Sequence, residues 1–252
     1  MNREREHLFV ARDQNELNIA AAGKIVQVCK ESIRANGRCS IALAGGSTPK
    51  PLYKLLAVRP FVEQIDWSRL HFFWSDERFV PPDHPDSNYQ MAFQTLLLKV
   101  AVPDANVHRV ETEQPDVETA ALQYESAMRS FFTTEDDAIP RFDLILLGLG
   151  EDGHTASLFP SSPAITESKR LVFGMYAEHI QGSRVTFTAP LINGARSVLF
   201  FVSGTSKARI LKVILEGPSR KELYPAQLVR PIDGTIYWFV DRNAAKELTI
   251  QS

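Results

Sequence analysis

The sequence predicts one α/β domain with a Rossmann-like, open and mostly parallel sheet that carries helices on both faces. Short apolar runs alternate with amphipathic segments from one end of the chain to the other. Some of these runs, such as 144–147, are continuously apolar, as strands buried on both faces are. Glycine-rich turns follow two of the runs, where open sheets hold their ligands. The pattern leaves room for a small subdomain or lid.

The first half of the chain supplies three of the expected strands. Asp13 and Glu16 form a capping pair for a helix whose apolar face includes Leu17 and Ile25, and Gly37 ends that helix. Strands are expected at 7–11, 39–44 and 70–75, with further helices through 52–56 and across 87–100 and 117–132.

The second half continues the alternation. Strands are expected at 142–147, 171–176, 184–188, 197–203 and 235–240, and helices over 206–215 and after Asp241. No repeat of fixed period, low-complexity tract or linker divides the sequence, so residues 1–252 are expected to form a single domain.

Composition narrows the class of protein. A globule of this length buries about 70–75% of its unfolded surface and needs neither a disulfide nor a metal to stay folded. The net charge of −2 argues against the basic field that nucleic-acid binding requires. Cys29 and Cys39 lack CxxC spacing and are interpreted as buried thiols.

Location and assembly are predicted from the same bulk properties. No stretch is long enough to span a bilayer, and the charged segment Met1–His7 lacks the apolar core of a signal peptide. We expect a cytoplasmic protein without a membrane or nucleic-acid partner, either a monomer or a small homo-oligomer.

The segment Gly45-Gly46-Ser47-Thr48-Pro49 follows a predicted strand and opens a predicted helix. Glycines let the backbone approach an anion, and helix amides with the Ser47 and Thr48 hydroxyls can donate to it. The segment is neither GxxxxGK[ST] nor GxGxxG, which favours a compact phosphate monoester over a nucleotide. A simple helix start with Pro49 near its first position is an equally good interpretation of this segment alone.

Asp76, Glu77 and Arg78 stand at the end of the expected strand 70–75. Two carboxylates and a guanidinium can bind sugar hydroxyls and a phosphate, or they can form a salt-bridged rim, and neither alternative is favoured in isolation. The aromatic run 72–74 before them is interpreted as core.

A catalytic loop is predicted at Gly148-Leu149-Gly150-Glu151-Asp152-Gly153-His154. A histidine there can exchange a proton near neutral pH, and Asp152 is near enough in sequence to orient it as a general base. The alternative is a structural histidine. A zinc site is disfavoured because the other five histidines show no HxH or HxxxH pairing.

Two cations flank apolar strands later in the chain. Arg184 begins Arg184-Val185-Thr186-Phe187-Thr188, and Lys207 lies at the start of a predicted helix. A cation gains nothing from the dipole at that end of a helix, so a bound phosphate explains Lys207 better than chance does.

Five segments, in order, resemble the 6-phosphogluconolactonases, within the wider group that includes glucosamine-6-phosphate isomerase/deaminase: 42–49, 73–89, 142–160, 184–193 and 201–208. Both branches share the Gly-x-Gly-x-Asp-Gly-His core. The deaminase branch continues His-Ile-Ala-Phe-Asn-Glu-Pro, whose glutamate supports ring opening, and Phe159 stands where that glutamate would be. Gln181-Gly182-Ser183 departs from the family's more proline-rich approach to Arg184, which affects only the pose of that loop.

The resemblance implies hydrolysis of 6-phospho-D-glucono-1,5-lactone, a step of the oxidative pentose phosphate pathway, without cofactor or metal. His154 would activate water, Asp152 would orient it or bind a hydroxyl, and Asp76 and Arg78 would line the sugar side. Arg78 or backbone amides of the glycine turns are candidate donors to the oxyanion. The phosphate would rest on Gly45, Gly46, Ser47, Thr48, Arg184 and Lys207. The alternatives are the isomerase/deaminase and a non-catalytic sugar-phosphate sensor.

Overall fold

Six parallel strands form the centre of the structure, a computed structural model that describes residues 5–134 and 138–249. The predicted domain of 1–252 therefore includes three short segments (1–4, 135–137 and 250–252) that lie outside the described residues. Every neighbouring pair in the sheet is parallel. In spatial order the strands are β1 (Glu6–Ala11), β9 (Thr235–Asp241), β8 (Ser197–Val202), β5 (Leu144–Leu147), β2 (Cys39–Leu43) and β3 (Leu70–Trp74).

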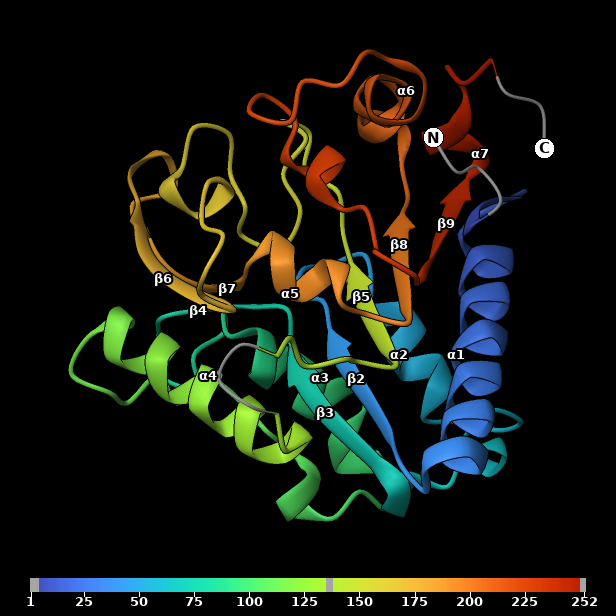
Figure 1. Cartoon of the computed structure of the whole chain (residues 1–252). Coiled ribbons are helices and arrows are strands. Elements are labelled where there is room, and N and C mark those ends of the chain that lie inside the picture. Colours follow the sequence, from blue (N-terminus) through green and yellow to red (C-terminus); the bar gives the residue numbers. More distant parts are fainter. Residues whose placement is uncertain (1–4, 135–137, 250–252) are drawn as a thin grey trace.

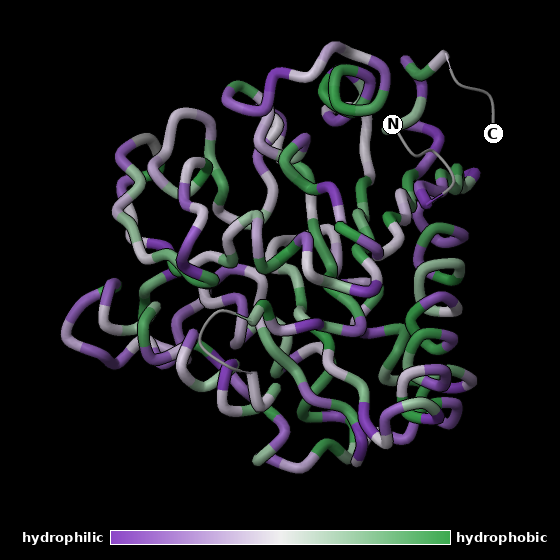
Figure 2. Tube along the Cα trace, in the orientation of Figure 1, coloured by the Kyte–Doolittle hydropathy of each residue, from purple (hydrophilic) through white to green (hydrophobic). Residues whose placement is uncertain are grey.

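Helices cover both faces of this sheet, as predicted (Figure 1). Successive strand residues alternate between two apolar clusters, so that Ile41 and Leu43 face one layer and Ala42 faces the other. The first layer contains α1 (Gln14–Asn36), α2 (Lys50–Leu56) and α3 (Asn88–Thr95). The second contains α4 (Val117–Phe132), α5 (Ala189–Asn193), α6 (Ala208–Glu216) and α7 (Arg242–Ala245). Hydrophobic positions accordingly concentrate along the central strands (Figure 2).

A separate antiparallel sheet lies beside the parallel one, against α4. It consists of β4 (Asp76–Arg78), β7 (Gly182–Phe187) and β6 (Val172–Ala177). The sequence placed Asp76–Arg78 at the end of the preceding strand, but these residues form a strand of their own. Ser75 is the point of transfer, because its N–H donates to Leu43 of β2 at 3.0 Å and its carbonyl accepts from Phe187 of β7 at 2.8 Å.

The ends of the helices follow the sequence signals closely. Asp13 accepts a hydrogen bond from the Glu16 N–H at 2.9 Å, and Gly37 ends α1 at φ 72°. Glu16 does not form a reciprocal capping box with Asp13, because its carboxylate accepts a hydrogen bond from the N–H of Arg12 at 2.7 Å. The helix expected over 87–100 ends at Thr95 and continues as a 3₁₀ turn. Among the described helices, none is long and apolar enough to cross a membrane.

His71 and His108 form a half-buried pair next to the aromatic core. Nδ1 of His71 lies 3.1 Å from Nε2 of His108, whose ring stacks on Phe73 at a centroid distance of 4.4 Å. Burial, together with the charges of His71 and Arg38, lowers the pKa of His108 from 6.5 to about 4.

Because of the lowered pKa of His108, we expect the stability of the folded protein to depend on pH. An unfolded histidine takes up its proton near pH 6.5, so the unfolded chain binds more protons than the folded chain between pH 6.5 and about 4. The contribution of neutral His108 is complete above that window and is lost as the pH falls through it. The free energy of unfolding, measured in urea, should therefore fall between about pH 7 and about pH 4.5 by about 1–2 kcal/mol more in wild type than in His108→Phe, allowing for solvent screening. Equal losses in the two proteins would contradict this assignment.

Candidate active site

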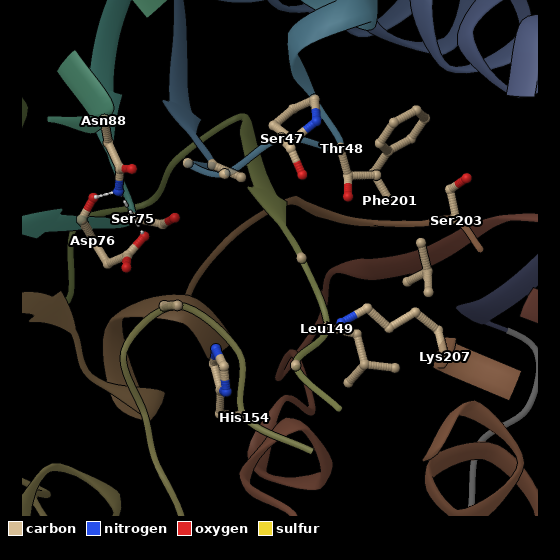
Figure 3. A pocket seen from close by; sticks show the side chains of 18 of the residues that line it. Ser47, Thr48, Ser75, Asp76, Asn88, Leu149, His154, Phe201, Ser203 and Lys207 are labelled. Carbon is tan, nitrogen blue, oxygen red and sulfur yellow. Dashed lines mark hydrogen bonds between the residues drawn. The ribbon is translucent and has the colours of Figure 1, made fainter. Parts of the chain in front are cut away.

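A cavity of about 240 Å³ opens at the carboxyl ends of four adjacent strands (Figure 3). Its walls come from the segments that follow β2, β3, β5 and β8. The chain passes from β2 to β3 on one side and later returns to β5 on the other, so the cavity lies where the strand order reverses. Residues of the predicted site that line it are Gly45, Gly46, Ser47, Thr48, Asp76, Arg78, His154 and Lys207.

The loop between β2 and α2 forms one wall of the cavity. Gly46 has φ +87°, a conformation that side chains with a Cβ rarely adopt, and Ser47 and Thr48 extend the wall towards α2. Gly45 is needed for a different reason, because a Cβ there would lie 1.9 Å from Oδ1 of Asn88. The glycine pair is thus explained by backbone geometry and close packing, and its role in anion binding stays a prediction.

His154 is held by Asp152 and Gly150 in a tight turn after β5. The N–H of Gly150 donates to the His154 carbonyl at 2.8 Å, and Nδ1 of His154 lies 2.5 Å from Oδ1 of Asp152. The backbone N–H of His154 donates to the same oxygen at 3.1 Å. Phe159 packs against the imidazole with ring centroids 4.8 Å apart. The ring is therefore oriented from two sides.

The partner of Nδ1 determines what the other ring nitrogen can do. An ionised carboxylate only accepts hydrogen bonds, so Nδ1 carries the proton and Nε2 of the neutral ring keeps its lone pair. Desolvation raises the pKa of Asp152, but the hydrogen bonds and charge of His154 outweigh it and lower that pKa to about 2. Asp152 therefore remains ionised across the neutral range, as an orienting group requires.

The wall formed by β4 brings Asp76 and Arg78 into the cavity. Nη1 of Arg78 donates to the carbonyl of Asp86 at 2.6 Å. Arg184 pairs with Arg78 across β4 and β7 but does not line this cavity. Burial and the neighbouring charge of Arg78 lower the pKa of Arg184 below its ordinary value. Two neighbouring arginines favour an anion nearby, although Arg184 is not one of the residues that line the cavity.

Lys207 enters the cavity from the segment after β8. Its Nζ lies 3.9 Å from Oε1 of Glu151, an exposed carboxylate of the loop that carries His154. The preceding turn is fixed by buried Asp241, which accepts from Ser203 Oγ at 2.5 Å and from the Gly204 N–H at 3.1 Å. Lys207 therefore projects from an anchored turn, and an incoming anion would compete with Glu151 for its ammonium group.

Sequence reasoning missed two polar residues that organise this wall, Asn88 and Ser157, and it did not predict that Glu77 anchors a helix instead of binding sugar hydroxyls or forming a salt-bridged rim. Asn88 lines the cavity, and its Nδ2 donates to the Asp76 carbonyl at 2.9 Å. Buried Glu77 accepts from the N–H groups of Asn88 and Tyr89 at 2.7 Å each, anchoring the start of α3. Burial raises the pKa of Glu77 to about 7, against the opposing effect of these donors. Ser157 is buried and donates to Asp76. Only the order of the matched segments hinted at these contacts.

Comparison with known proteins defines the family. A sequence profile described as glucosamine-6-phosphate isomerases/6-phosphogluconolactonase matches residues 12–238, nearly the whole chain. The chain belongs to this family. It is 45% identical to a 6-phosphogluconolactonase of Synechocystis over 218 residues, which cover 86% of this chain and 88% of that protein.

Solved structures of the family agree on the fold. A 6-phosphogluconolactonase from Trypanosoma cruzi superimposes with a TM-score of 0.86 at 34% identity and covers 97% of each chain. A monomeric glucosamine-6-phosphate deaminase superimposes with a TM-score of 0.81 at 20% identity, covering 96% of this chain and 100% of that one. Both family branches therefore share this architecture, and only site residues can separate them.

Proposed function

We propose that this family member hydrolyses 6-phospho-D-glucono-1,5-lactone to 6-phospho-D-gluconate. Family relatives at up to 45% identity carry the name 6-phosphogluconolactonase. The observation on which the mechanism depends is the 2.5 Å contact between Nδ1 of His154 and Asp152. This contact commits Nε2 to act as the acceptor, in a residue that lines a cavity alongside a lysine and a glycine-rich loop.

In the proposed reaction, Nε2 of His154 takes a proton from water as the water oxygen bonds to C1 of the lactone. Arg78 and the backbone amides of the glycine turns are the proposed donors to the resulting oxyanion. The bond between C1 and the ring oxygen then breaks, and the imidazolium returns its proton to that oxygen. Asp152 stays ionised and orients the ring, while Asp76 accepts from a sugar hydroxyl.

The phosphate is proposed to bind at the loop 45–48 and Lys207, with Arg184 adding positive charge behind Arg78. Each charge-assisted contact contributes about 1.5–3 kcal/mol. Lys207→Ala should therefore raise KM by about 10–100-fold with a much smaller change in kcat, and Arg184→Ala should act in the same direction. Lys212→Ala, on the adjoining α6, is the matched control. An unchanged preference for phosphorylated over unphosphorylated lactone in both variants would refute this assignment.

A coupled assay tests the activity itself. Glucose-6-phosphate dehydrogenase generates fresh lactone, and its disappearance is followed with and without this protein. Loss of lactone no faster than in buffer, together with tight binding of 6-phosphogluconate, would instead support a non-catalytic sensor. Release of ammonia from glucosamine 6-phosphate would support the deaminase alternative. Phe159 argues against that alternative, because an apolar ring packed on His154 cannot relay a proton.

Other aspects of the proposal stay predictions from the sequence. They are the cytoplasmic location, the monomeric or small homo-oligomeric state, the absence of cofactor, metal and nucleic-acid partner, and the single domain.

A further inference from the structure

Ser157 is a buried residue that contacts a cavity wall from behind. It is 1% exposed and does not line the cavity, yet its Oγ donates to Oδ2 of Asp76 at 2.7 Å. Its own N–H donates at 3.1 Å to Oγ1 of Thr186, which lies directly opposite Asp76 in the pairing of β4 with β7. Ser157 is therefore fixed by the same sheet that carries Asp76.

The other carboxylate oxygen of Asp76 is held from the opposite side. Nδ2 of Asn88 lies 3.4 Å from Oδ1 and donates to the Asp76 carbonyl at 2.9 Å. Asn88 is 2% exposed, and its side chain is confined by close packing against Gly45. Each carboxylate oxygen of Asp76 thus has one fixed donor on the protein side.

This arrangement determines what Asp76 offers to a ligand. A carboxylate oxygen accepts about two hydrogen bonds, so each oxygen keeps acceptor capacity after its protein contact is made. Asp76 lines the cavity on the side away from Lys207 (Figure 3). A ligand whose anionic end binds near Lys207 would therefore present its more distant hydroxyl groups to Asp76.

We propose that Ser157 is a positioning residue that aims the Asp76 carboxylate at a ring hydroxyl next to the reacting carbonyl, and so makes the enzyme selective for hydroxylated lactones. This inference rests on the proposed lactonase function. A site built to hydrogen-bond a substrate hydroxyl discriminates strongly against an analogue that lacks it, because its acceptor is left unpaired. Ser157 strengthens that discrimination without touching the substrate.

The test is a cycle of two changes, one in the protein and one in the substrate. Wild type and Ser157→Ala are assayed with the natural lactone and with its 2-deoxy and 3-deoxy analogues, all 6-phosphorylated. With the natural lactone, Ser157→Ala should lower kcat/KM by about 10–30-fold, as loss of a well-aimed charge-assisted hydrogen bond predicts. With the 2-deoxy analogue, which lacks the hydroxyl next to the carbonyl, the same substitution should lower kcat/KM by less than about 3-fold, whereas the 3-deoxy analogue should show the full loss of about 10–30-fold.

Two further variants guard against a merely structural effect. Thr188→Val disturbs the end of β7 by removing a hydrogen bond to the Arg170 carbonyl but leaves the contacts of Ser157 and Asp76 in place, so any loss should be equal for all three lactones. Asp76→Ala removes both acceptor oxygens, so it should abolish discrimination against the 2-deoxy lactone, and it serves as the readout if Ser157→Ala does not fold. A Ser157→Ala penalty that is equal for all lactones, or absent with the natural one, would overturn the inference. Failure of wild type to hydrolyse the natural lactone would instead overturn the proposed function.

Discussion

Replacement of His154 by glutamine should lower kcat by about 10²–10⁴-fold while KM changes by less than about 3-fold. The reason is that glutamine keeps much of the volume and polarity of the side chain but cannot accept a proton from water near neutral pH. Initial rates with freshly generated lactone measure both constants. His7→Gln, on the edge strand β1, is a matched control and should leave both constants unchanged.

The pH profile adds a second readout for the same assignment. The pKa of Asp152 is about 2, so this carboxylate does not change charge above about pH 4. Glu77, whose pKa burial raises to about 7, is present in both proteins, so an acid limb of kcat/KM that wild type shows and His154→Gln lacks would report the imidazole, which acts as a base only when it is neutral. Wild-type turnover in His154→Gln would remove histidine from the mechanism.

Gly150→Ala should also lower kcat by about 10²-fold or more, although residue 150 carries no reactive group. A Cβ at this position would lie 2.1 Å from Nδ1 of His154 and 2.5 Å from Oδ1 of Asp152. The pair would have to separate, and the imidazole would lose its orientation. Both side chains are partly exposed, so they can move without unfolding the core.

The control for this substitution is Gly23→Ala. Gly23 lies within α1, and a Cβ there would meet no atom within 4 Å. Alanine should preserve turnover and stabilise the helix by up to about 1 kcal/mol. Thermal unfolding, measured together with the kinetics, shows whether a loss of turnover in either variant comes from a loss of stability. If Gly150→Ala retained full activity, the close packing of the His154–Asp152 pair would be irrelevant to catalysis.

Local sequence signals were sufficient to predict most of the parallel sheet and its helices. Continuous apolar runs such as 144–147 mark strands buried on both faces, and Asp13 and Gly37 mark the ends of α1. The strands at 171–176 and 184–188 were also anticipated, but not their antiparallel sheet with Asp76–Arg78. Strand pairing depends on contacts between distant segments, which apolar patterning does not specify.

In the candidate site, too, local features could be predicted from the sequence and contacts between distant residues could not. The loops 45–49 and 148–154 were predicted because their glycine patterns are local and each follows a strand. The contacts of Asp76 with Ser157 and Asn88 were not predicted, because they join residues 81 and 12 positions apart in the chain. Side-chain networks of this kind require the tertiary fold before they can be recognised.

A crystal structure with bound 6-phosphogluconate would show whether His154 reaches the reacting carbon of the ligand. We expect Nε2 of His154 to lie within about 2.6–3.5 Å of an oxygen of the C1 carboxylate, with the phosphate on the loop 45–48 and Lys207. A product bound in the reverse direction, with its carboxylate beyond the reach of His154, would contradict it.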